Sequence, residues 1–98
     1  MSDEDREAPT PKQSGSFGIM LSICRDSKLD LERWLPSVPQ PIEKRVIELI
    51  QEFKKLSVRV QGWTIDTPQE SKRATVDLIL ELRAEAQGFA NRYGYKLR

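Results

Sequence analysis

The longest amphipathic pattern in the chain covers residues 41–61. Apolar side chains recur there at alternating spacings of four and three, at Ile42, Val46, Leu49, Phe53, Leu56 and Val60. This is the spacing of a heptad coiled-coil seam, and Trp63 continues it. Pro41 suits a first helical turn, and Gly62 suits a helix end. The pattern therefore predicts a long helix over 41–61 with a continuous apolar face.

A second long helix is predicted over residues 68–93. Its main apolar stripe consists of Leu78, Leu82, Ala86, Phe89 and Tyr93, with Thr75, Ile79 and Ala90 beside it. Val76 and Leu80 lie off this stripe, so the helix is apolar almost all round near its middle. A helix of this kind needs cover from more than one side.

The start of the second helix carries helix-capping residues. Thr67 is placed to cap it, Pro68 suits its first turn, and Glu70 completes a capping box. Because only a short turn over residues 62–66 and the cap Thr67 separate the two long helices, we expect them to form an antiparallel helical hairpin.

The segment before these helices is ambiguous. Four apolar residues alternate strictly, which is a strand period, at Phe17, Ile19, Leu21 and Ile23. Met20 and Cys24 interrupt that alternation, so we expect residues 16–24 to be extended or irregular. The alternatives are a strand paired with another chain and a short helix continuing into the next segment. Residues 27–35 predict a short helix, which ends at a Pro-rich connector.

The fold class that follows is all-α, with one helical domain over residues 16–98. Residues 1–15 combine four acids with Pro, Ser and Gly, and they predict a disordered acidic tail. A hairpin with one short helix has a thin core. We therefore expect dimerisation or docking on a partner to complete a four-helix type of bundle.

Composition favours an intracellular protein. Cys24 is the only cysteine in 98 residues, which excludes an internal disulfide. No apolar run approaches the length of a membrane span, and no secretory signal is evident. We therefore expect a cytoplasmic location, with no membrane partner.

The chemistry of the chain points away from an enzyme. Histidine is absent, so the commonest general base and the Ser–His and Cys–His pairs are excluded. No phosphate-binding loop or zinc spacing occurs. Asp77, Glu81 and Glu85 form an acidic row, but their spacing of four and the lack of histidine do not make a metal site. We predict no catalytic residue, cofactor, metal or small-molecule substrate. The row is interpreted as solvated or paired with a neighbouring helix, with partner docking as the alternative.

Protein–protein interaction is the predicted function, as a small adaptor, assembly factor or regulator. The surplus apolar surface predicts a homodimer or another protein partner, bound through Trp34, Trp63, Val76, Leu80, Phe17, Ile19 and Leu21. The alternative is a nucleic-acid-binding regulator. Its candidate residues mix basic and aromatic side chains at the C-terminal end: Arg92, Tyr93, Tyr95, Lys96 and Arg98.

Overall fold

The computed structural model describes residues 14–97, which form three α-helices and a short 3-10 turn. The elements are α1 (Ser14–Trp34), the turn η2 (Leu35–Ser37), α2 (Gln40–Gln61) and α3 (Gln69–Arg92). No strand occurs in this part of the chain. The predicted all-α class is therefore confirmed. Of the predicted tail over 1–15, only Ser14 and Gly15 fall inside the described residues, where they begin α1.

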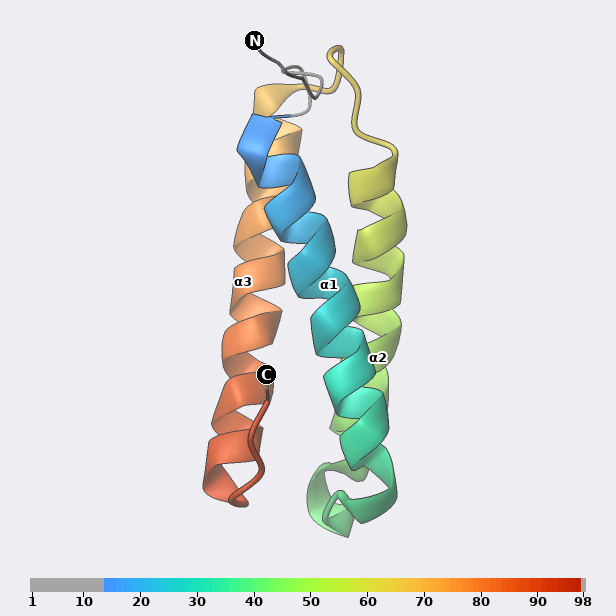
Figure 1. The fold of residues 1–98 in the computed structure, drawn as a ribbon, viewed down its shortest axis with the longest axis vertical. Coiled ribbons are helices and arrows are strands. Elements are labelled where there is room, and N and C mark those ends of the chain that lie inside the picture. The colour runs from blue at the N-terminus through green and yellow to red at the C-terminus, as the bar shows by residue number, and fades with distance from the viewer. Residues whose placement is uncertain (1–13, 98) are drawn as a thin grey trace, which may run out of the picture.

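The three helices lie side by side as an elongated bundle. α1 and α3 run in the same direction and α2 runs in the opposite one (Figure 1). α2 and α3 form the predicted antiparallel hairpin, while α1 lies across the front of both. The bundle measures 51 × 27 × 17 Å along its principal axes.

The apolar seam predicted on α2 forms the centre of the core. All six of its residues are buried: Ile42, Val46, Leu49, Phe53, Leu56 and Val60. The bounds of α2 and α3 differ by one residue from the predicted 41–61 and 68–93 at three of the four ends. Pro39 precedes α2 in an extended conformation, and the first turn of α2 contains a Pro. A proline ring fixes φ near its helical value, and its missing N–H costs nothing in the first turn because N–H groups there have no partner within the helix.

The alternating segment 16–24 is helical, so the prediction of an extended or irregular segment is wrong. The short helix predicted over 27–35 is the second half of the same helix, α1. In a helix, alternation places Phe17 and Leu21 on one flank and Ile19 and Ile23 on the other. Met20 lies between the flanks and is buried in the core. The alternating pattern therefore gives this helix a broad apolar face, because it adds apolar residues on both sides of Met20.

A polar residue obscures the seam of α1 in the sequence. The buried line of this helix follows the same spacing of four and three as α2, through Met20, Cys24, Ser27, Leu31 and Trp34. Ser27 is completely buried at a position where a heptad pattern normally has an apolar residue. Because of this serine, the sequence pattern breaks in the middle of a continuous helix.

The buried line of α3 is displaced from the predicted stripe. It consists of Thr75, Ile79, Leu82, Ala86 and Ala90. Leu78 and Phe89, predicted at its centre, are half-buried, and Tyr93 is exposed. The reason is that α3 packs against two helices, so its most buried residues face the space between α1 and α2.

The capping box predicted for α3 does not form. Pro68 occupies the N-cap position, where no side chain makes a capping hydrogen bond. The Thr67 hydroxyl is used inside the preceding loop, where its Oγ1 accepts a hydrogen bond from the Thr64 N–H at 2.8 Å. The loop therefore stabilises itself rather than the helix that follows.

The end of α3 is a Schellman motif centred on Gly94. Its φ is +74°, in the left-handed region that favours glycine. The N–H of Tyr95 donates to the carbonyl of Ala90 at 2.8 Å, and that of Gly94 donates to Asn91 at 3.3 Å. This turn directs residues 95–97 back along the bundle (Figure 1).

Candidate protein-docking surface

Both tryptophans belong to the core of the single chain, which leaves little of either ring exposed for the predicted contact with a partner. Trp34 is 3% exposed and Trp63 is 9% exposed. The ring of Tyr95 stacks on Trp34. The Lys72 ammonium lies 5.9 Å from the centre of the Trp63 ring, a cation–π contact that joins the loop to α3.

Four branched apolar residues lie where α1 meets α3: Ile19, Ile23, Val76 and Leu80. We refer to them as the α1–α3 apolar surface. Ile19 is 58% exposed and Leu80 is 47% exposed, while Ile23 and Val76 are half-buried against the core. Three of the four were predicted as partner-binding residues from the sequence. Ile23 was not, although it lies one turn from Ile19 on the same flank.

The Arg83–Ser27 hydrogen bond relates positions along the two helices to within the reach of an arginine side chain. It joins Arg83 Nη1 on α3 to Ser27 Oγ on α1 at 3.2 Å. Ile23 lies one turn before Ser27, and Leu80 lies one turn before Arg83. Because α1 and α3 run in the same direction, these two residues lie at about the same level.

The next turn repeats this arrangement. Ile19 lies two turns before Ser27, and Val76 lies two turns before Arg83, so these residues are also level. The α1–α3 apolar surface therefore has two rungs, Ile19 with Val76 and Ile23 with Leu80.

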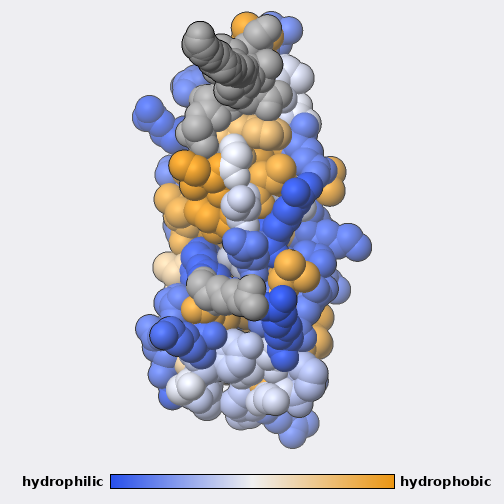
Figure 2. Space-filling view, viewed as in Figure 1, coloured by the Kyte–Doolittle hydropathy of each residue, from blue (hydrophilic) through white to orange (hydrophobic). Residues whose placement is uncertain are grey.

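Hydrophobic residues gather on the face of the molecule shown in Figure 2. They gather in the upper half of that face, over the N-terminal half of α1 and its neighbours, with hydrophilic residues below them and along their right side. The flank of α1 toward α2 contributes Phe17 and Leu21, both half-buried against the core. The outer side of α1, between the flanks, carries the exposed Gly18 and Ser22. An apolar patch with a polar rim is typical of an interaction surface.

The lower part of the α1–α3 boundary is polar. Asp30 on α1 is 3% exposed, and its carboxylate lies 4.0 Å from Arg83 and 3.9 Å from Arg33. Arg83 also donates to Ser27, as described above. Sequence reasoning missed this cluster, although Ser27 and Asp30 lie three apart and so share a helix face. The cluster marks the lower end of the apolar surface.

The acidic row divides between pairing and solvent. Arg45 on α2 donates to both oxygens of Glu85 on α3, with Nε–Oε2 at 2.5 Å and Nη2–Oε1 at 2.7 Å. This contact holds the pKa of Glu85 below its usual range and raises that of Arg45. Asp77 and Glu81 are exposed. The predicted pairing with a neighbouring helix is therefore seen for Glu85.

The described residues do not present a site for metal or thiol chemistry. Within residues 14–97, no group of three or more acids or cysteines is arranged to hold a metal ion. Cys24 is completely buried, and burial raises the pKa of its thiol to about 11. At neutral pH this group is a thiol rather than the reactive thiolate.

The C-terminal residues do not form a free basic and aromatic tail. The ring of Tyr95 stacks on Trp34, and Leu97 is buried in the core. Arg92, Tyr93 and Lys96 are exposed, and Arg98 lies outside the described residues. Tyr95 is thus occupied by Trp34 instead of being displayed for stacking on a base.

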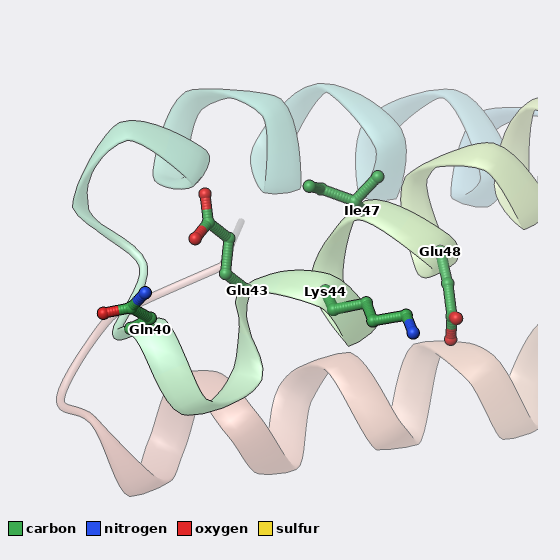
Figure 3. A pocket seen from close by; sticks show the side chains of 5 residues that line it. All are labelled: Gln40, Glu43, Lys44, Ile47 and Glu48. Carbon is green, nitrogen blue, oxygen red and sulfur yellow. The ribbon is translucent and has the colours of Figure 1, made fainter.

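The outer face of α2 has two shallow hollows, each lined by a single helix. One is lined by Gln40, Glu43, Lys44, Ile47 and Glu48 (Figure 3). The other is lined by Gln51, Lys54, Lys55 and Val58. Each contains one exposed apolar residue among charged and amide side chains. Single exposed apolar residues are common on protein surfaces, and these hollows do not define a site.

Comparisons with known proteins do not assign a family. No protein-family model matches the chain, and no curated protein or solved structure matches it significantly. None of the helices in residues 14–97 is long and apolar enough to cross a membrane.

Proposed function

We propose that this chain is a non-enzymatic protein–protein interaction module that binds its partner through the α1–α3 apolar surface. The supporting observation is that Ile19 and Leu80 remain about half exposed beside the half-buried Ile23 and Val76. Burying branched apolar side chains of this size against a partner is favourable by about 1.5–3 kcal/mol for each fully exposed residue. Exposure near one half reduces that gain in proportion.

Among residues 17–97, the other exposed apolar residues do not form a comparable cluster. Val58 lies among lysines on the outer face of α2, and Ile65 lies in the loop before α3. Leu29 lies one turn from Arg25 and Arg33, which are both exposed. These isolated side chains offer a partner less apolar area than the two rungs of the α1–α3 apolar surface.

Affinity capture from cells tests this proposal. The full chain serves as bait, in parallel with Ile19→Asp, Leu80→Asp and the control Val58→Asp. Val58 is 63% exposed, so the control places the same charge on a different face. We expect the first two variants to lose the captured proteins and the control to retain them. Equal capture by all four baits would contradict the proposal. An intracellular, cytoplasmic setting stays a prediction from the sequence.

A further inference from the structure

The two helices that form the α1–α3 apolar surface carry the same pattern in opposite directions. On α1, Ile19, Ile23 and Asp26 are separated by four and then three residues. On α3, read backwards, Leu80, Val76 and Arg73 are also separated by four and then three. Each series runs from two branched apolar residues to a charge, and the two charges are opposite.

We propose that the partner at this surface is a second copy of the same chain, docked antiparallel. This inference rests on the proposed docking function and adds the identity of the partner. A two-fold rotation that reverses the helices brings the Ile19–Val76 rung of one copy against the Ile23–Leu80 rung of the other. Four branched side chains then meet in one layer, and the symmetry produces a second, identical layer.

The charges at the ends of the surface favour the antiparallel arrangement. Asp26 and Arg73 are both exposed, and they lie at opposite ends of the two rungs. Reversing the second copy places its Arg73 at the level of Asp26 in the first, on the neighbouring helix, and the same juxtaposition occurs at the other end. A parallel arrangement gathers both Asp26 residues at one end and both Arg73 residues at the other, which is repulsive.

The outer side of α1 leaves room for a second helix. Gly18 and Ser22 are exposed between the two apolar flanks of the helix. A Cβ atom added at Gly18 has no heavy atom within 4 Å, so none of the described residues fills the space beside it. Small residues one turn apart allow two helices to approach closely. The second copy therefore has access to the flank residues on both sides.

Sedimentation equilibrium on the full chain tests the two-fold pairing. We expect the mass to rise from monomer toward twice the monomer as the concentration rises. Ile19→Asp and Gly18→Glu weaken dimerisation about tenfold or more, because they place charge inside the interface. The control Val58→Asp leaves it unchanged. Gly18 is open to solvent in the single chain, so Gly18→Glu separates loss of pairing from loss of folding.

Charge reversal tests the direction of pairing. Asp26→Arg and Arg73→Asp each weaken dimerisation by about threefold to tenfold at low salt, and the double reversal restores it. If the double reversal has a native circular dichroism spectrum but does not restore dimerisation, the antiparallel arrangement is contradicted.

The mass of the wild-type chain in sedimentation equilibrium distinguishes failure of the second-copy proposal from failure of the proposed docking function. A wild-type monomer at every concentration overturns the second-copy proposal. If that monomer still captures proteins in an Ile19-dependent manner, the docking function stands with a different partner. If capture is also independent of Ile19, both proposals fail.

Discussion

The rings of Trp34 and Tyr95 stack with their centroids 4.9 Å apart and their planes 11° apart. Trp34 ends α1, whereas Tyr95 follows α3, so this contact joins two regions far apart in the sequence. Together with the buried Leu97, it attaches the C-terminal segment to the core. The segment is therefore part of the folded domain.

Replacing Tyr95 tests that attachment. Tyr95→Ala removes the stack, and we expect it to lower the free energy of unfolding by about 1–2 kcal/mol, the scale of a stacked aromatic pair with some lost burial. The emission of Trp34 also changes, because the indole loses its neighbouring ring. Urea unfolding followed by fluorescence measures both effects. Tyr93→Ala serves as the control because Tyr93 is exposed. Equal losses in the two variants would contradict the packed arrangement.

The Arg45–Glu85 pair predicts a pH-dependent contribution to stability. The pKa of Glu85 is lowered by Arg45, so protonation is less favourable in the folded than in the unfolded chain. The contribution is present above the unfolded carboxyl pKa of about 4.3 and disappears as the pH falls through the folded value. Because the pair is partly exposed, we expect it to contribute less than about 1 kcal/mol.

Comparing wild type with Glu85→Gln measures that contribution. The difference in unfolding free energy is expected near pH 7 and is lost on acidification. Glu81→Gln is the matched control on the same helix, since Glu81 is exposed. If the difference in unfolding free energy between wild type and Glu85→Gln grows as the pH falls, the Arg45–Glu85 pair does not stabilise the fold in the way expected.

The buried cluster around Asp30 is expected to be sensitive to the loss of one partner. Arg83→Met removes a charge beside the buried carboxylate and a donor to Ser27. We expect destabilisation of about 2 kcal/mol, because a buried charge with fewer partners retains its desolvation cost. Arg83→Met combined with Asp30→Asn is expected to cost less than the sum of the single changes. Chemical denaturation of all four proteins in a double-mutant cycle measures the coupling, and strict additivity would refute it.

Two glycines are expected to respond oppositely to alanine. Gly94→Ala places a Cβ on a backbone with φ of +74°, which costs about 1–2 kcal/mol. Gly18→Ala enters an exposed helical position with open space around it and is expected to stabilise the fold by up to about 1 kcal/mol. Thermal unfolding of both variants checks this contrast. Changes of the same sign are inconsistent with the helix end described here.

The sequence predicts the regular parts of this fold better than its exceptions. The α2 seam is purely apolar, and Pro36, Pro39 and Pro41 mark the start of its helix, so both the position and the buried face of α2 follow from the sequence. α1 is harder because Ser27 occupies a core position and its partner, Arg83, is 56 residues away. The periodicity of a single sequence describes one helix at a time and does not reveal a contact between residues this far apart.

The candidate surface was partly predictable for a related reason. Ile19, Val76 and Leu80 stand out in the sequence as apolar residues with no obvious cover. In the structure Ile19 and Leu80 are about half exposed, and Val76 is half-buried against the core. Trp34 and Tyr95, which the sequence presents as exposed binding residues, stack on one another in the structure. That contact depends on the turn at Gly94, which reverses the chain after α3.

Site-specific photo-cross-linking in cells tests the central claim most directly. A photoreactive phenylalanine analogue is introduced separately at Ile19, at Leu80 and, as the control, at Val58. The docking surface predicts light-dependent protein adducts from the first two positions and none from the third, with an adduct of twice the chain mass where the partner is a second copy. Adducts absent at both Ile19 and Leu80, or equally abundant at Val58, would contradict the claim that the α1–α3 apolar surface binds protein.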